Sequence, residues 1–515
     1  MKEKSIVLVR GQIVFKNGSL NNEAVPSLGL AYISGYLRKK GYKVKIVDAT
    51  GEGLNRISKL KEYPGFSCQG LTNSEVLSKI SSNSDVIAFS AMFSGEWPVL
   101  RDLITQTRKL FPNALLVAGG EHITGLTEYS LRDCPALDVC VRGEGEQTFY
   151  ELLEAHFRKD NYFDVPGISY LDEKNKYRQN GDKPLRIQNI NKIPWPDWPE
   201  NYLEGFWKTQ KSYGVATERD MPFLVSRGCP FQCSFCSNVF MWDTRYQFRD
   251  ISDIIEEIKF YIKRYRITSI QLYDLTAIIK KKWIIDFTQA MIDEGISINW
   301  SLPSGTRSEA LDKEVLSMLK KTHCNYLVFA PESGSQRTLK KIKKRVKLDR
   351  LTSSLMEAKR QGLIVRTSLI IGFPHETWKD IFQTVLYQMK MAIKGVDDVP
   401  LYIFSPYPGT EIYNDLLKAG KIQLNDDYFF SLTSLNGDYF STNVITFGEN
   451  INGRMLGIVR LTAVLINYSI SYLLYPKRII RSIKNIYSGA SATTVFEHRL
   501  KDFFNRKKQT TSSTL

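Results

Sequence analysis

The sequence predicts an α/β protein in which a doubly wound parallel sheet is followed by a partial TIM-type barrel of six β/α units and a helical C-terminal region. Five short β-branched runs alternate with helical stretches near the N-terminus, and six more alternations follow residues 191–200, a stretch rich in Pro and Trp. Beyond them, apolar residues recur at helical spacing. We therefore divide the chain into a first domain 1–157, a linker 158–221, a barrel 222–425 and a mainly helical region 426–515 with a basic, partly disordered tail.

The first domain contains five apolar runs of the length of buried strands: residues 5–11, 43–49, 85–91, 114–120 and 138–146. Ligands of a doubly wound sheet bind beyond the carboxyl ends of its strands. The residues at those ends are Ser90, Gly119, Gly120, Glu121, Gly143 and Glu144. We predict a ligand site there because glycine lets a ligand approach the backbone, although each glycine could serve only its turn. No GxGxxG follows the first strand, which argues against a nicotinamide cofactor.

The barrel part repeats a strand and a helix six times, which is three quarters of a TIM-type barrel. Its expected strands are residues 223–228, 269–274, 298–304, 326–333, 365–372 and 399–406. The chemistry of such barrels lies on the loops that follow the strands. Those loops hold Asp274, Ser304, Arg307, Glu332 and Gly372. Arg307 could hold a carboxylate or a ribose, and Asp274 could instead cap the next helix.

The loop after the first barrel strand holds Cys229, Cys233 and Cys236. A closed zinc site needs a fourth ligand, and neither a histidine nor another cysteine stands nearby. A redox CxxC pair needs only two thiols, whereas a 4Fe-4S cluster on three cysteines leaves one iron open to a substrate or cofactor. The remaining cysteines are expected to be small buried side chains: Cys68, Cys134, Cys140 and Cys324.

Charge and cysteine content limit the partners and the compartment. The formal net charge of +16 suits nucleic acid, an acidic membrane surface or an anionic substrate. Seven cysteines in 515 residues are far fewer than a disulfide scaffold carries, and no secretory leader pattern opens the sequence. We therefore expect a cytoplasmic protein.

The CxxxCxxC loop, with Phe235 before its last cysteine, stands on a six-unit barrel and resembles the radical S-adenosylmethionine (SAM) enzymes. The resemblance implies a 4Fe-4S cluster whose open iron binds SAM. It also implies an external one-electron donor, such as a flavodoxin or ferredoxin, and cleavage of SAM to a 5′-deoxyadenosyl radical. Glu332 matches a family position that contacts SAM, Asp274 stands where the family binds the methionyl amine, and the loop of Gly372 looks like a family loop.

The first domain looks like that of the cobalamin-binding subgroup, on residues 26–49, 119–122 and 141–153. This implies cobalamin at the strand ends, but no DxHxxG supplies a histidine to cobalt, and we interpret His122 as a loop residue. The implied activity is cobalamin-dependent methylation of an unactivated carbon. The alternative is a radical SAM cyclase or carbon-carbon coupling enzyme that acts on a lipid or isoprenoid without methyl transfer.

Two other classes fit less well. An RNA-modifying methylthiotransferase would need a second cluster on three N-terminal cysteines and a C-terminal β-barrel, whereas Cys140 falls inside an expected strand and the tail has helical spacing. We therefore expect no nucleic acid partner. A non-catalytic iron-sulfur module would not need Glu332, Gly372 and six ordered loops.

The C-terminal region suggests a membrane contact. Residues 460–476 are apolar but shorter than the roughly 20 residues of a transmembrane helix. From residue 476 onward there are nine Lys or Arg against two acids, interleaved with isoleucines at helical spacing, as in a basic amphipathic helix on an anionic bilayer. Packing of both helices on the barrel is the alternative. The six basic residues within 339–347 are expected on a solvated helix face, and residues 509–515 are expected to be disordered.

Overall fold

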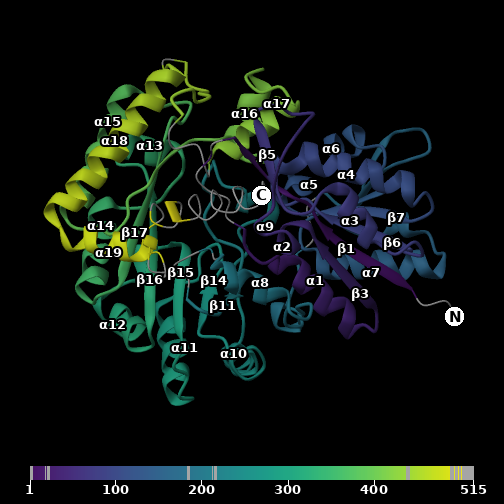
Figure 1. Ribbon diagram of the computed structural model, residues 1–515, viewed down its shortest axis with the longest axis horizontal. Helices are drawn as coiled ribbons and strands as arrows, with labels where there is room; N and C mark the ends of the chain where they lie inside the picture. Colours follow the sequence, from purple (N-terminus) through teal and green to yellow (C-terminus); the bar gives the residue numbers. More distant parts are fainter. Residues whose placement is uncertain are drawn as a thin grey trace, which may run out of the picture.

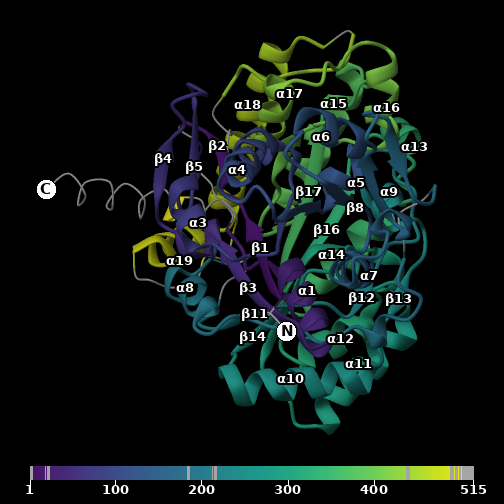
Figure 2. The same ribbon diagram turned by 90° about the vertical axis from the view of Figure 1, so that its right-hand side faces the viewer.

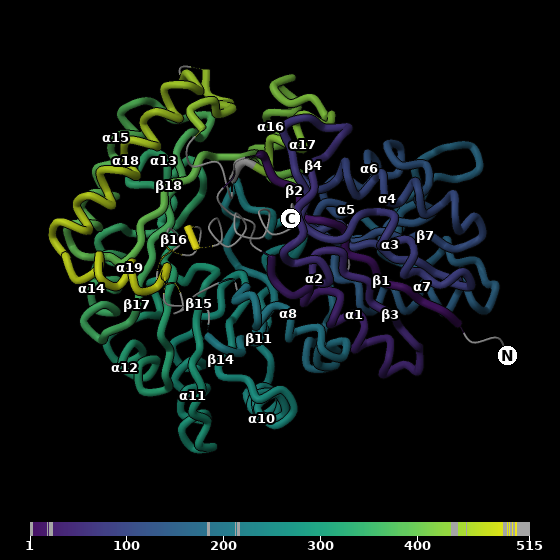
Figure 3. The backbone as a smooth tube through the Cα atoms, in the orientation of Figure 1, coloured from purple at the N-terminus to yellow at the C-terminus, as the bar shows by residue number. Residues whose placement is uncertain are grey.

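The computed structural model describes residues 4–17, 19, 24–182, 186–211, 213, 217–435, 441–449, 451–487, 492, 494, 497 and 500–501. Two α/β parts stand side by side, the N-terminal one in purple and blue and the barrel in teal and green (Figure 1). From the side, the N-terminal sheet lies in front of the barrel (Figure 2). The chain passes between them through α8 (Tyr202–Thr209) and β11 (Asp220–Phe223), as the tube shows (Figure 3). The predicted fold class is confirmed.

The first sheet has the strand order β10-β9-β8-β7-β6-β1-β3. The five predicted strands are present and parallel: β1 (Ser5–Arg10), β3 (Lys43–Asp48), β6 (Val86–Ser90), β7 (Leu115–Gly119) and β8 (Val139–Val141). Helices cover both faces, which explains why the inner strands are continuous apolar runs, whereas the edge strand β3 exposes two lysines. One face packs on α1 (Leu28–Lys39) and α7 (Gly145–Arg158). The other packs on α3 (Asn73–Lys79), α4 (Trp97–Leu110), α5 (Glu121–Gly125) and α6 (Thr127–Asp133).

The first sheet continues beyond the boundary expected at residue 157. Two antiparallel strands, β9 (Ile168–Leu171) and β10 (Tyr177–Gln179), extend it past β8. A separate antiparallel sheet of β2 (Ile13–Lys16), β5 (Phe66–Gln69) and β4 (Ile57–Lys59), next to α2 (Ala49–Glu52), has no counterpart in the sequence prediction. These strands have only three or four residues, too few to show an alternating pattern.

The Pro- and Trp-rich linker is extended and tightly held. The Trp195 indole donates to Asp253 at 2.9 Å, and Ser34 donates to Asp197 at 2.8 Å. A Cβ on Gly35 of α1 would lie 2.3 Å from the carbonyl oxygen of Trp195, so only glycine lets the linker pass this close. The linker therefore packs between the first domain and the barrel helix α10 (Ile251–Tyr265) and connects the two.

The barrel is a six-stranded parallel sheet in chain order, as predicted: β11, β14 (Ser269–Leu272), β15 (Asn299–Thr306), β16 (Cys324–Glu332), β17 (Ile364–Ile371) and β18 (Leu401–Ile403). Its outer layer contains α10, α11 (Lys281–Asp293), α12 (Lys313–Lys321), α13 (Gln336–Lys341), α14 (Leu348–Arg360) and α15 (Trp378–Ile393). The predicted first strand is interrupted after Phe223. Its second half, β12 (Ser226–Arg227), pairs with β13 (Gln247–Phe248) on either side of the cysteine loop and α9 (Asn238–Trp242).

The C-terminal region packs on both parts. It begins with α16 (Glu411–Lys418) and α17 (Asp426–Ser431), and Arg101 of α4 pairs with Asp426 at 2.8 Å. The long helix α18 (Gly453–Leu474) then packs along α15, and α19 (Lys477–Tyr487) follows it on the side of the barrel away from the first domain (Figure 1). Residues 509–515, expected to be disordered, lie outside the described residues.

The length argument against a membrane-spanning helix does not hold. At 22 residues, α18 is the helix in the described part of the chain that is long and apolar enough to cross a membrane, although 33% of that stretch is buried in the protein. Its buried face includes Arg460, which donates to the Ser441 carbonyl, and Tyr468 donates to Asp398 at 2.9 Å. Helix α18 extends beyond the apolar run because Asn452 caps it seven residues earlier than expected, with its side chain on the Met455 amide.

Candidate functional site

A cavity of about 390 Å³ separates the carboxyl ends of the first sheet from the start of the barrel. All six residues predicted at those strand ends line it: Ser90, Gly119, Gly120, Glu121, Gly143 and Glu144. The barrel contributes Ser226, Arg227, Gly228, Tyr273, Asp274 and Leu275. The cavity thus occupies the position where open α/β sheets bind ligands, and the barrel closes its other side.

The walls of this cavity suit a broad, mostly apolar ligand. Its apolar lining includes Leu30, Ile33, Val117, Phe149, Met241 and Trp242. Gly120 has a φ of 119°, and a Cβ there would lie 2.6 Å from the Ala91 carbonyl oxygen. Gly143 also has a positive φ, 73°. This glycine edge and its apolar surroundings fit a flat corrin ring, so these residues are suited to hold cobalamin.

His122 belongs to the protein core. Its Nδ1 lies 2.9 Å from Ser94 Oγ, its Nε2 lies 3.2 Å from Ser130 Oγ, and its ring stacks on Trp97. Burial lowers the pKa of His122 to about 3, which keeps the ring neutral. The residue lies in the short helix α5 and not in a loop, so that expectation was wrong. Its contacts leave neither ring nitrogen for cobalt.

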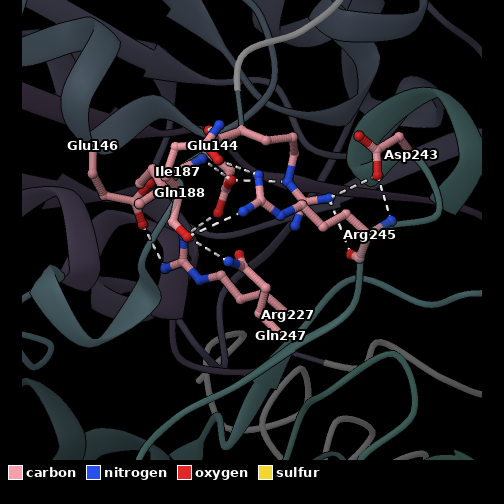
Figure 4. A network of polar contacts seen from close by, with 9 residues as sticks. Glu144, Glu146, Ile187, Gln188, Arg227, Asp243, Arg245 and Gln247 are labelled. Atoms are coloured by element: carbon pink, nitrogen blue, oxygen red, sulfur yellow. Dashed lines mark hydrogen bonds and ion pairs between the residues drawn. The ribbon is translucent and has the colours of Figure 1, made fainter.

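Glu144 serves as the centre of a buried ion network (Figure 4). Its carboxylate accepts from Arg227 Nη1 at 2.8 Å, from Arg186 Nε at 2.9 Å and from the Ile187 amide at 2.6 Å. Arg227 also donates to Glu146 at 2.6 Å. Glu144 was predicted as a cofactor contact. It does line the cavity, but its carboxylate connects the first sheet to the linker and to the strand that precedes the cysteine loop.

Asp274 also lies in the cavity wall with its carboxylate engaged. Both oxygens accept from the Val225 amide at 3.2 Å, and one accepts from the Ser226 amide at 2.5 Å and from its hydroxyl. Burial raises the pKa of Asp274 to about 6. The capping interpretation is wrong, because the next helix, α11, begins at Lys281. Asp274 instead fixes the interruption between β11 and β12 that leads into the cysteine loop.

The three cysteines lie in the loop that follows β12, with Cys233 buried and Cys229 and Cys236 half-buried. In the described ranges, no three His, Cys, Asp or Glu side chains lie close enough to hold a single metal ion. A 4Fe-4S cluster does not require that closeness, because each cysteine binds a different iron atom. The donor set of three thiols without a fourth fits a cluster with one open iron.

Burial is the main cause that raises the pKa of all three thiols, to about 12 for Cys236. Neighbouring thiols raise the pKa of Cys229 and Cys236 further, and the carboxylate of Glu332 raises that of Cys233. The thiols therefore stay protonated until a metal displaces the protons. The four other cysteines are buried and unpaired, as predicted: Cys68, Cys134, Cys140 and Cys324.

Charged side chains of the barrel lie beside the cysteine loop. Glu332 ends β16 with a φ of 70°, a strained conformation for a residue with a Cβ, and pairs with Lys344 at 2.9 Å. Both charges affect the pKa of the Cys233 thiol: Lys344 lowers it and Glu332 raises it. The guanidinium carbon of Arg307 lies 3.7 Å from the Phe231 ring centre, and its buried Nε has no partner among the described residues. Arg307 also pairs with Glu309 at 2.9 Å. Two cations, two carboxylates and an orphaned donor suit the zwitterionic methionyl end of SAM.

Two predicted residues lie outside this group. Ser304 stands within β15, half-buried, and is not among the residues that line the cavity. Gly372 has a φ of 90°, and a Cβ there would lie 2.7 Å from Leu456 of α18. The absence of a side chain at Gly372 therefore lets the C-terminal helix α18 pack closely against this loop.

Sequence reasoning missed several residues of the site. Arg10 and Glu96 line the cavity, and burial raises the pKa of Glu96 to about 8. Arg227 stands two residues before Cys229, and this position next to the motif was a usable signal. Lys344 lay in a basic run, and nothing local distinguished it from its neighbours.

Comparison with known proteins gives the same assignment of the two domains. Residues 223–387 match the model of the radical SAM superfamily, and residues 22–153 match that of the B12 binding domain. An uncharacterized methyltransferase of Pyrococcus horikoshii is 31% identical over 388 residues, which cover 75% of this chain and 78% of the relative. The anaerobic magnesium-protoporphyrin IX monomethyl ester cyclase of Rubrivivax gelatinosus is 25% identical over 408 residues, 78% of this chain and 68% of the cyclase.

The fold also resembles a solved structure. TsrM, a radical S-adenosylmethionine methyltransferase from Kitasatospora setae determined with cobalamin and a 4Fe-4S cluster, aligns with a TM-score of 0.65 and 12% identity. The alignment covers 98% of this chain and all of TsrM. At this identity, the likeness shows a shared fold.

Proposed function

This chain belongs to the radical SAM superfamily, in the group that joins a B12-binding domain to the barrel, and we propose from that premise that it methylates an unactivated carbon. The observation that carries the proposal is the cavity between the glycine edge of the first sheet and the barrel strands that lead into the cysteine loop. When bound, the cluster supplies the electron that cleaves SAM to a 5′-deoxyadenosyl radical, and cobalamin carries the methyl group. An external one-electron donor, such as a flavodoxin or ferredoxin, reduces the cluster.

The residues of this chain hold and orient these groups. Cys229, Cys233 and Cys236 bind the cluster, and the charged group of Arg307, Lys344 and Glu332 would hold the methionyl end of SAM. The apolar cavity walls keep water away from a reactive carbon radical. The bonds of Arg227 to Glu144 hold the B12-binding domain and the cysteine loop at a fixed separation.

The second candidate is a cyclase or carbon-carbon coupling enzyme without methyl transfer. The similarity over 78% of this chain to a relative named as a cyclase favours it. The candidates differ in what becomes of SAM: methyl transfer yields S-adenosylhomocysteine, whereas a radical reaction alone yields 5′-deoxyadenosine.

The test uses protein purified anaerobically with cobalamin supplied. We expect a visible spectrum with retained corrinoid and, after reduction with SAM, both S-adenosylhomocysteine and 5′-deoxyadenosine by mass spectrometry. A matched protein with Cys229, Cys233 and Cys236 changed to Ala should form no 5′-deoxyadenosine. No retained corrinoid, with 5′-deoxyadenosine as the sole product, would favour the second candidate. Absence of both products would refute the two together.

We further propose that the acceptor is hydrophobic, such as an isoprenoid or a lipid-linked precursor, and is met at a membrane surface. The supporting observation is the exposed apolar face of α18 and α19, where Leu473 is 79% and Ile480 is 72% exposed.

The prediction that the basic residues of α19 form its outer face is wrong in part. Arg478 is buried on the Gly395 carbonyl, and Arg481 lies 3.5 Å from Asp397, so these arginines face the barrel. The helix turns its isoleucines outward.

A further inference from the structure

An open cleft of about 970 Å³ adjoins the cysteine loop and the turn after α13. One wall consists of Pro230, Phe231 and Gln232, the three residues between Cys229 and Cys233. The opposite wall is the turn between α13 and α14 together with the ends of these helices. The cleft therefore reaches the peptide that binds the cluster without passing through the cavity of the first domain.

The cleft is strongly cationic. Its lining contains one carboxylate, that of Glu309, and six cationic side chains: Lys340, Lys343, Lys344, Arg345, Lys347 and Arg350. The basic run at 339–347 was expected on a solvated helix face, which is wrong for most of it. Helix α13 ends at Lys341, and Lys343 adopts a φ of 56° in the turn that follows.

Two of these cations are neutralised within the protein, and others face outward. Lys344 pairs with Glu332, and Lys343 pairs with Glu411 at 2.5 Å. In the described ranges, the side chains of Lys340, Arg345 and Lys347 are exposed and form no ion pair. A cluster of unpaired cations repels itself, so its arrangement on one face suits an external polyanionic partner.

The basic turn is mechanically connected to the cluster loop. The Ser234 amide, directly after Cys233, donates to the Ile342 carbonyl at 3.1 Å. Arg307 rests on the Phe231 ring and donates to the Arg345 carbonyl at 2.5 Å. A partner seated on the turn therefore lies against the cysteine loop, and electron transfer is faster when donor and acceptor are close.

We propose that this cleft is the docking surface for an acidic one-electron carrier protein that reduces the cluster. The inference rests on the proposed function, because an electron carrier would bind at this cleft only if the cysteine loop holds a cluster that it reduces. The carrier presents carboxylates to Lys340, Arg345 and Lys347. One electron passes from the reduced carrier to the cluster, which leaves the carrier one electron more oxidised and the cluster one electron more reduced.

The test compares two reductants of the reconstituted protein, reduced flavodoxin and dithionite. The triple variant Lys340→Glu, Arg345→Glu, Lys347→Glu should lower the second-order rate constant for bleaching by flavodoxin at least tenfold at low salt. The rate with dithionite should change less than twofold, since this small reductant needs no docking surface. The control changes three exposed lysines elsewhere to Glu: Lys109, Lys174 and Lys263. It has a closely similar net charge and should keep the wild-type rate with flavodoxin.

The outcomes separate this inference from the proposed function. A flavodoxin rate that is equal in wild type and the triple variant, or a wild-type rate insensitive to salt between 0.05 and about 0.5 M, would overturn the docking surface alone. Binding of an RNA oligonucleotide that the triple variant loses, with the flavodoxin rate unchanged, would assign the cleft to nucleic acid and also overturn it. A protein that neither reductant bleaches would overturn the proposed function and this inference with it.

Discussion

Arg227, two residues before the first cysteine of the motif, donates to Glu144, which lies three residues after β8, at 2.8 Å. The two side chains are 7% and 0% exposed, so the pair is excluded from water. Burial would disfavour the charged guanidinium, but the carboxylates of Glu146 and Glu144 outweigh it and raise the pKa of Arg227. This buried ion pair thus connects the B12-binding domain to the cysteine loop. Removal of either partner would leave an unpaired buried charge, which costs free energy.

The first prediction concerns this pair. In Arg227→Met, Glu146 loses its ion pair, and Glu144 keeps its bonds to Arg186 and the Ile187 amide. Breaking a buried pair leaves uncompensated charge, and we expect the free energy of unfolding to fall by about 3 kcal/mol. Urea denaturation under anaerobic conditions measures the change. The control, Arg132→Met, breaks an exposed pair with Glu128 and should cost about 0.5 kcal/mol or less. Equal effects of the two substitutions would contradict the prediction.

The second prediction concerns the cysteines. The triple variant of Cys229, Cys233 and Cys236 to Ala should bind no cluster after anaerobic reconstitution, whereas wild type binds about four iron atoms. Cys324→Ala is the matched control, because that thiol is buried in the barrel core away from the loop. Iron and sulfide analysis with the visible spectrum gives the readout. Equal iron in the triple variant and wild type would refute the assignment of the cluster to these residues.

These results show which parts of the site are local in sequence. The cysteine motif and the strand-end glycines could be predicted because each follows directly from a short pattern and from the rule that ligands bind at the carboxyl ends of strands. The partners Arg227 and Glu144 are 83 residues apart, and only the packing of two domains brings them together. The position of Glu332 at a strand end could be predicted. Its partner Lys344 could not, because the basic run around it was predicted to be a helix face, whereas Lys344 lies in a turn.

The third prediction follows from Asp274, whose pKa burial raises to about 6 from an ordinary 3.8. The folded protein binds this proton more tightly than the unfolded chain, so the resulting stability is present below about pH 4 and is lost as the pH rises through 6. Asp274→Asn has no such dependence. Relative to wild type, its stability should therefore improve from pH 4 to pH 7, by up to about 3 kcal/mol. Urea midpoints at several pH values measure this.

The exposed Asp293→Asn serves as the control, and its difference from wild type should vary little over the same range. If the difference between wild type and Asp274→Asn were constant with pH, the buried carboxyl would not titrate as stated.

The fourth prediction concerns the charges beside Cys233. A cation near the cluster favours its reduced form, and a carboxylate disfavours it. Lys344→Met should therefore lower the midpoint potential of the cluster, and Glu332→Gln should raise it. An interaction of about 1 kcal/mol corresponds to about 40 mV for one electron, which is the smallest shift we expect. Redox titration followed by electron paramagnetic resonance measures both. Lys341→Met, an exposed lysine that ends α13, should leave the potential unchanged. Shifts of the same sign in the two variants would contradict the electrostatic account.

The last prediction tests the membrane contact. Removing the C-terminal region would uncover Gly372 and the face of α15 that α18 covers, so point substitutions are the cleaner experiment. Wild type should float with anionic liposomes and less so with neutral ones or at high salt, since each of the two exposed lysines of α19 contributes about 1 kcal/mol. The double variant Leu473→Glu, Ile480→Glu places charge on the exposed apolar face and should reduce the floated fraction at least tenfold.

The matched control, Leu110→Glu, changes an apolar residue that is 61% exposed on the first domain and should float as wild type does. Flotation that is unchanged in the double variant would locate the contact elsewhere on the chain. No flotation of wild type with any lipid would remove the reason for a membrane-borne acceptor. The acceptor would then have to be a natural product or peptide that reaches the cavity through water, because the cofactor-binding residues alone place no restriction on its class.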